Sequence, residues 1–139
     1  MFTPFHSRSA NAYKVVGIET GIPQADPHTL VNMLFEGLLQ QIGAARSALA
    51  RGDIKAKCKH IVSAVRLLEE GLKGGLNHSA GGTLAQTLQD IYDFCEMRLT
   101  QANVRNDDRM LDEVRQVIEP IADAWKRIGG AVPVPERVM

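Results

Sequence analysis

The sequence predicts an all-α protein: an antiparallel four-helix bundle with a short N-terminal helical segment. Apolar residues recur at three- and four-residue spacing in four successive stretches of the 139-residue chain, and this period places them on one face of a helix. Each stretch begins and ends at residues that cap or end helices, and the connections between the stretches suit neighbouring helices that run antiparallel. We expect one domain, in which residues 1–25 form an N-terminal cap segment and linker, 26–128 the bundle, and 129–139 a flexible C-terminal tail.

The first two bundle helices have clear boundaries. Asp26 can cap free backbone N–H groups, and Pro27 suits the first helical position because it lacks an N–H. Gly52 favours the left-handed conformation that ends a helix, and Asp53 offers the next cap. The second helix should run to the glycine-rich stretch 71–82, which we expect to be a loop. The residues expected to face the core are Val31, Leu34, Phe35, Leu38, Ile42, Ala45 and Leu49, then Ile54, Cys58, Ile61, Val62, Val65, Leu68 and Leu72.

The third and fourth helices are bounded in the same way. Thr83 and Gln86 have the spacing of a capping box, and Asn106-Asp107 supplies a turn and a cap for the next helix. Pro120 removes a backbone hydrogen bond, so we expect a kink or local break near Gln116, and Gly129-Gly130 should end the helix. The core-facing residues expected here are Leu84, Leu88, Ile91, Tyr92, Cys95, Leu99 and Ala102, then Met110, Val114, Val117, Ile118, Ile121, Trp125 and Ile128.

Composition excludes several function classes. Sixteen Lys plus Arg balance sixteen Asp plus Glu, so no excess positive charge draws the molecule onto nucleic acid or an anionic membrane. The most apolar run contains Glu36 and is shorter than a bilayer span, which argues against membrane insertion. No secretory signal is evident at the N-terminus, and the two separated cysteines suit reduced, packed thiols. We therefore expect a protein that stays in the reducing cytosol in which it is made.

Catalytic and metal-binding patterns are lacking. The four histidines, His6, His28, His60 and His78, have no second ligand at the spacing that would place both on one helical face. Cys95 lies on a core stripe rather than in the cationic setting of a reactive thiolate. We predict no catalytic residue, metal or cofactor. The alternative, a small metal- or cofactor-binding bundle enzyme, would need convergent polar residues on stripes that are mainly aliphatic.

Apolar residues beyond one stripe per helix form the candidate binding groove. They could widen the core, form a homodimer contact, or leave an exposed groove in which the helix of a partner protein binds. The residues concerned are Leu30, Met33, Leu39, Phe94, Met97 and Val104.

Five segments in order and spacing carry a family resemblance over about residues 10–128. They are NAYKVVGIET, DPHTLVNMLFEGLL, ARGDI, GGTLAQTLQDIYDFCEMRLTQANVRND and IADAWKRI. Together they resemble the FliS flagellar secretion chaperones. The resemblance implies a helical bundle that binds the C-terminal segment of flagellin in the cytosol, prevents its premature polymerisation and delivers it to a component of the flagellar export gate.

The same resemblance implies a role for the N-terminal segment. It would cover part of the binding surface when no client is present and contribute to client binding, through Tyr13, Val16 and Ile18. The chain departs from the family pattern at Ala10, where relatives often carry a larger apolar residue, and at Pro120. The main alternative function is a helical adaptor or regulator that binds another flagellar protein, such as an anti-sigma factor.

Overall fold

The computed structural model describes residues 26–131, with side chains through residue 128. Its elements are α2 (Pro27–Ala50), α3 (Ile54–Arg66), the π-helical η2 (Leu67–Lys73), α4 (His78–Arg105) and α5 (Asp108–Ala131). The described part of the chain contains no strand, so the predicted all-α bundle is confirmed. The predicted N-terminal helical segment, with Tyr13, Val16 and Ile18, lies outside the described residues.

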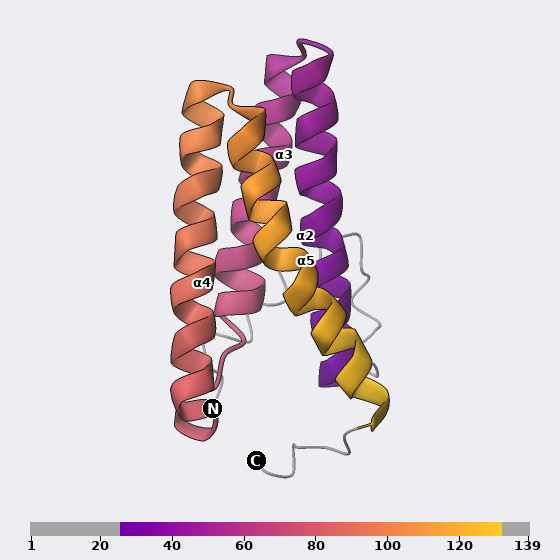
Figure 1. The fold of residues 1–139 in the computed structure, drawn as a ribbon, viewed down its shortest axis with the longest axis vertical. Coiled ribbons are helices and arrows are strands. Elements are labelled where there is room, and N and C mark those ends of the chain that lie inside the picture. Colours follow the sequence, from indigo (N-terminus) through magenta and orange to yellow (C-terminus); the bar gives the residue numbers. More distant parts are fainter. Residues whose placement is uncertain (1–25, 132–139) are drawn as a thin grey trace.

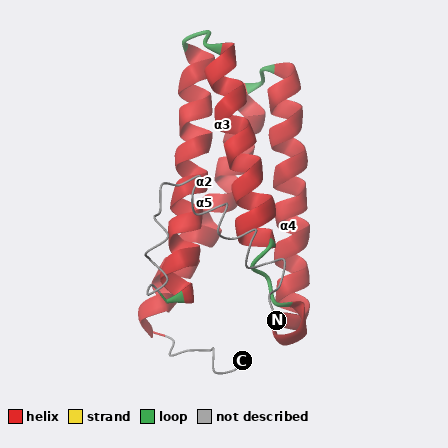
Figure 2. Cartoon of the chain, turned by 180° about the vertical axis from the view of Figure 1, so that it is seen from behind, coloured by secondary structure: helices red, strands yellow, loops and turns green. Residues whose placement is uncertain are grey.

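The helices form an antiparallel bundle in which sequence neighbours are also spatial neighbours. α2 packs against α3 and α5, and α4 packs against α3, η2 and α5. Figure 1 shows α5 between α2 and α4 on the near side, and Figure 2 shows α3 between them on the far side. α2 and α4 therefore occupy diagonal corners of the bundle.

The core is aliphatic and lies along the centre of the bundle. Leu38, Ile42, Leu67, Leu99 and Val114 are fully buried and come from all the described elements except α3, which contributes Ile61 and Ala64. Most predicted core residues are buried or pack against this cluster. Leu111 is also fully buried, although the helical pattern did not assign it to the core.

Four predicted core residues are instead exposed. Leu84 and Ile128 are 65% and 44% exposed, because the C-terminal half of α5 turns away from the N-terminal half of α4 (Figure 1). Ile54 and Val62 of α3 are 43% and 54% exposed. Val62 follows the buried Ile61 and is therefore rotated about 100° from the core-facing direction.

The predicted helix boundaries at α2 and α3 are confirmed. The Asp26 carboxylate accepts a hydrogen bond from the Thr29 N–H at 2.8 Å, and Asp53 accepts one from the Ala56 N–H at 3.1 Å. Gly52 between the two helices has a φ of 77°. Asn106, at the turn between α4 and α5, also adopts the left-handed conformation, with φ 52°.

The predicted loop over 71–82 is wrong along most of its length. η2 continues through Lys73 because Leu72 packs in the core, and that packing outweighs the helix cost of Gly71. α4 then begins at His78, capped by the Asn77 side chain. Its backbone is interrupted at Gly82 (φ 52°, ψ −125°), so a continuous helix does run from Thr83.

Two other local expectations also change. The Gln86 side-chain amide donates to Asp90 at 3.0 Å, along the helix rather than back toward Thr83. α5 extends to Ala131, beyond the glycine pair that was expected to end it. As expected from Pro120, Figure 1 shows a bend about midway along α5, and the helix remains continuous through it.

Candidate binding surfaces

The six candidate groove residues lie on two helices that are not adjacent. On α2, Leu30 and Met33 are half-buried and Leu39 packs against the core. On α4, Phe94, Met97 and Val104 are 40%, 48% and 80% exposed. Because α2 and α4 sit at diagonal corners, the structure does not bring the six residues together in one groove. The α4 residues are the more accessible of the two sets.

The exposed face of α4 also carries a cationic side chain. The Arg98 guanidinium lies 5.9 Å from the centre of the Phe94 ring, within the range of a cation–π contact. It also donates to the Gln101 side chain and forms an ion pair with Glu113 of α5 at 2.8 Å. These contacts hold the Phe94 ring beside a fixed positive charge.

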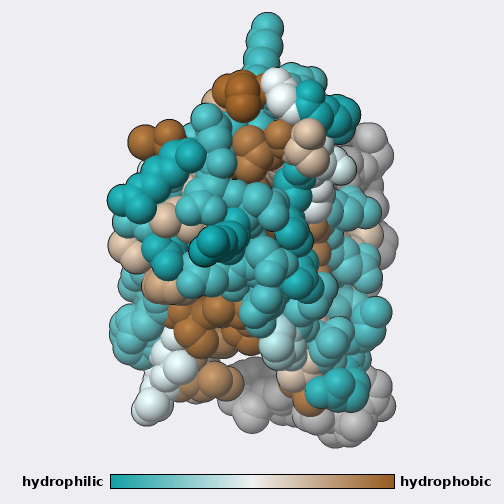
Figure 3. All heavy atoms as spheres, turned by 45° about the horizontal axis from the view of Figure 1, so that its top comes forward, coloured by the Kyte–Doolittle hydropathy of each residue, from teal (hydrophilic) through white to brown (hydrophobic). Residues whose placement is uncertain are grey.

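Ile54 and Val62 of α3 add exposed apolar surface that the sequence pattern assigned to the core. Each lies on a helix that packs against α4. The sequence did carry a signal that these two residues are exposed: basic residues lie next to them, and charged residues are typical of the solvent-facing side of a helix. Figure 3 shows hydrophobic residues as separate patches on a mostly hydrophilic surface.

The start of α2 and the end of α5 meet through two residues of the family-like motifs. His28 and Trp125 stack with ring centres 4.8 Å apart and planes 12° apart. His28 Nε2 lies 2.6 Å from the Trp125 carbonyl oxygen, and the Trp125 indole N–H donates to the His28 carbonyl at 3.1 Å. The Pro27-His28 and Trp125 motif positions therefore contribute a structural contact between α2 and α5.

Tyr92 and Asp93, from another of the family-like segments, lie where α4 packs against η2. Tyr92 is buried, and burial raises the pKa of its phenol. Asp93 accepts a hydrogen bond from the Lys73 ammonium at 2.6 Å, and the same ammonium lies 2.8 Å from Glu69. Glu96 is also close, with its Oε2 atom 3.5 Å from Lys73 Nζ. Three carboxylates thus share one ammonium at this contact.

Burial and the neighbouring Glu69 raise the pKa of Glu96 to about 7. Burial by itself would lower the pKa of Lys73, but hydrogen bonds to Asp93 and Glu69 outweigh it and raise that pKa. Lys73 is therefore charged near neutral pH, whereas Glu96 takes up a proton in that range. Just below neutral pH, the cluster of Lys73, Glu69, Asp93 and Glu96 can therefore bind one proton more than the same four side chains would bind in isolation.

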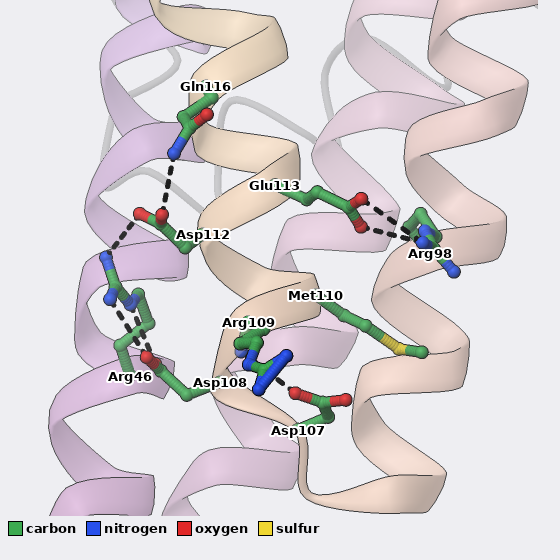
Figure 4. A pocket seen from close by; sticks show the side chains of 9 residues that line it. All are labelled: Arg46, Arg98, Asp107, Asp108, Arg109, Met110, Asp112, Glu113 and Gln116. Atoms are coloured by element: carbon green, nitrogen blue, oxygen red, sulfur yellow. Dashed lines mark hydrogen bonds and ion pairs between the residues drawn. The ribbon is translucent and has the colours of Figure 1, made fainter.

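A depression of about 450 Å³ lies over the start of α5 (Figure 4). Arg46 of α2 pairs there with Asp108 at 2.7 Å and with Asp112 at 2.9 Å, and Arg98 pairs with Glu113. The hydrogen bond from Arg46 lowers the pKa of Asp108. Carboxylates thus pair with Arg46 and Arg98, and the lining as a whole, with three arginines and four carboxylates, carries no excess of positive charge.

The described residues offer little catalytic chemistry. They contain no cluster of three or more His, Cys, Asp or Glu side chains able to hold a metal ion. Burial raises the pKa of the Cys95 thiol to about 12, so this thiol is not a nucleophile near neutral pH. Among the described helices, none combines the length and apolarity needed to cross a bilayer.

A helical bundle with a packed aliphatic core and exposed apolar residues on two adjacent helices is the framework of a protein-binding module. The family model described as Flagellar protein FliS matches residues 9–132. The chain belongs to this family. The resemblance found in the sequence is therefore confirmed.

Curated relatives are similar along most of their length. A flagellar secretion chaperone FliS of Salmonella typhimurium is 40% identical over 84% of this chain and 87% of its own. Those of Vibrio cholerae and Bacillus subtilis are 34% and 32% identical, over 86% and 78% of this chain and 88% and 80% of their own. These are chaperones, so the family assignment defines a chaperone rather than an enzyme.

Proposed function

We propose that this protein is an export chaperone that binds the C-terminal segment of flagellin in the cytosol, prevents its premature polymerisation and delivers it to the flagellar export apparatus. The family supports an export chaperone role. The observation that carries the client-binding step is the exposed apolar set on α4, Phe94, Met97 and Val104. Burying such side chains against a client removes apolar surface from water.

The proposed client is a segment that folds as it binds. A chain that is unordered before assembly loses conformational freedom on binding, and burial of its apolar residues must offset that loss. Amphipathic helices achieve this by placing residues at three- and four-residue spacing on an apolar surface. The α4 set has the related spacing of three and seven residues along the helix, which suits such a partner.

The N-terminal segment completes the proposed mechanism. Tyr13, Val16 and Ile18 cover part of the binding surface when the client is absent and contribute to client binding. Tyr13→Ala should weaken binding of the flagellin segment while the bundle stays folded. Calorimetric titration measures the affinity, and a far-UV circular dichroism melt checks the fold; an affinity equal to that of the unaltered protein would contradict this role.

The client surface is tested by calorimetric titration of the flagellin C-terminal segment into Phe94→Ala/Met97→Ala protein. We expect an affinity lower by about tenfold or more, since two partly exposed anchors are lost. Leu84→Ala is the matched control, because Leu84 is an exposed apolar residue of the same helix outside the candidate set. An equal loss in both variants would contradict the assignment of the surface.

Titration of the flagellin segment into the unaltered protein tests the proposed function itself. If it fails to bind the flagellin segment, the client assignment is wrong even though the family assignment stands. A pull-down from flagellated cells then separates the adaptor alternative, in which another flagellar protein is recovered and flagellin is not.

A further inference from the structure

The surface where α3 lies beside α4 combines exposed apolar residues with a basic edge. Lys57 of α3 donates to the Asn103 carbonyl and side-chain oxygens of α4, at 2.8 Å and 2.6 Å. The helices run antiparallel, so counting back from this contact places Val62 level with Met97. Ile54 lies about one helical turn before Lys57, so the same counting places it near Val104.

These residues face the same side of the helix pair. At about 100° per residue, Ile54 and Val62 lie about 60° and about 140° round α3 from Lys57, and Val104 and Met97 lie about 100° and about 120° round α4 from Asn103. Because the helices run antiparallel, both rotations lead to the same side of the Lys57–Asn103 contact. The two rows therefore lie along the seam between the helices. We call the exposed residues Ile54, Val62, Met97 and Val104 the α3–α4 apolar face.

A basic strip borders this face on the α3 side. Lys55, Lys59 and Arg66 recur at spacings of four and seven residues, which places them on one outer stripe next to Val62. All three are exposed. Lys55 and Lys59 form no ion pair with a described residue, whereas Arg66 lies 3.5 Å from Glu70.

Acidic groups are lacking along the middle of the surface. The helix α3, Ile54–Arg66, contains no Asp or Glu, and α4 contains none from Met97 to Arg105. Among the described residues, carboxylates lie toward the two ends of this surface: Asp53 at one end, and Glu69, Glu70, Asp93 and Glu96 at the other. A protein of balanced net charge thus presents a locally positive edge beside apolar residues.

We infer that the α3–α4 apolar face binds an amphipathic helix of a partner protein whose apolar stripe is bordered by carboxylates. The apolar stripe covers Val62 and Met97, and the carboxylates lie against Lys55 and Lys59. Charge complementarity selects this partner and its orientation, since opposite charges speed association and the wrong sign is repelled. The inference deepens the proposed function, on which it rests for the binding role of Met97 and Val104, and it adds the charge pattern of the partner helix.

Two designed peptides test the inference on the full-length protein. Both form amphipathic helices with the same leucine stripe; one carries Glu along the edge of the stripe and the other carries Lys. We expect the Glu peptide to bind at least about tenfold more tightly, with an affinity that falls as salt is raised. Equal binding of the two peptides, or binding of neither, would overturn the inference.

Charge reversal locates the site. Lys55→Glu/Lys59→Glu should weaken the Glu peptide by about tenfold and strengthen the Lys peptide. Lys126→Glu, an exposed lysine on α5, should change neither. Val62→Ser should weaken both peptides. Circular dichroism melts confirm that each variant is folded, and an effect of Lys126→Glu equal to that of the double variant would overturn the site.

The remaining outcomes separate this inference from others. Binding of the unaltered protein to phosphatidylglycerol vesicles without binding to the Glu peptide would assign the surface to a membrane and overturn the inference. If the flagellin segment fails to bind but the Glu peptide behaves as expected, the client proposal fails alone. If the flagellin segment binds but the Glu peptide does not behave as expected, only this inference is contradicted.

Discussion

Lys57 carries a charge into the interior between α3 and α4. Its side chain is only 1% exposed, and its ammonium donates to both oxygens of Asn103. A buried ammonium is costly unless hydrogen bonds replace its lost water. The Asn103 side chain and carbonyl supply that replacement, so the pair fixes the register between the two helices as well as stabilising them.

Lys57→Ala should lower the free energy of unfolding by about 2–3 kcal/mol. The change removes the packed stem of the side chain and leaves two oxygens of Asn103 without this donor. Lys59→Ala, on the exposed side of the same helix, should cost less than about 0.5 kcal/mol. Urea unfolding followed by circular dichroism measures both, and equal costs would show that the Asn103 contact contributes little.

Glu96 makes stability depend on pH. Its pKa is raised from 4.5 to about 7, so the folded protein binds more protons than the unfolded chain between these values. Stability therefore falls as pH rises from about 4.5 to 7 and levels off above that range. After allowance for solvent screening, the contribution is about 1–2 kcal/mol.

Glu96→Gln isolates this contribution. Urea unfolding from pH 5 to pH 8 should show a smaller fall in stability than the unaltered protein, because the amide cannot ionise. Glu119→Gln, which alters an exposed ion pair with Arg115, should retain the fall. If Glu96→Gln shows the same slope, the carboxylates around Lys73 do not control the pH response.

At the scale of the helix, local sequence signals predicted where helices begin better than they predicted how long the helices are. Asp26, Asp53 and Gly52 were identified correctly because capping depends on the backbone within a few residues. The glycine-rich stretch misled the prediction because burial of Leu72 favours continued helix, and one sequence does not show which neighbours will bury it. The exposure of Leu84 and Ile128 depends likewise on the course of α5.

Two glycines test how η2 ends. A Cβ at Gly74 would collide with the Glu70 backbone carbonyl, whereas one at Gly43 of α2 would meet nothing within 4 Å. Gly74→Ala should lower the free energy of unfolding by about 1–3 kcal/mol through overpacking. Gly43→Ala should raise it by about 0.5–1 kcal/mol because Ala favours the helix. Thermal melts compare them, and stabilisation by both would contradict a tight turn at Gly74.

In the molecule as a whole, α5 is tied to α2 near both ends. Arg46 pairs with Asp108 and Asp112 near the start of α5, and His28 stacks on Trp125 near its end. α4 is tied to α5 by Arg98 and Glu113 near the same start. Side-chain contacts of this kind join residues far apart in sequence, so spacing alone could not predict them.

The candidate binding surface shows the same limit. The sequence correctly predicted that Phe94, Met97 and Val104 point away from the core stripe of their helix, because that depends only on helical period. It could not show that Leu30 and Met33 lie on the helix diagonal to α4, or that Ile54 and Val62 are exposed on a helix that packs against α4. Those relations follow from how the helices pack.

The bundle should fold without the segment that precedes it. Its buried cluster joins residues of α2, α3, η2, α4 and α5, including Leu38, Ile61, Leu99 and Ile118, and cooperative unfolding depends on such a shared core. A chain that starts at residue 26 should therefore keep its helical circular dichroism signal and a single unfolding transition. A broad transition with loss of near-UV signal would instead show that residues 1–25 are needed to complete the core.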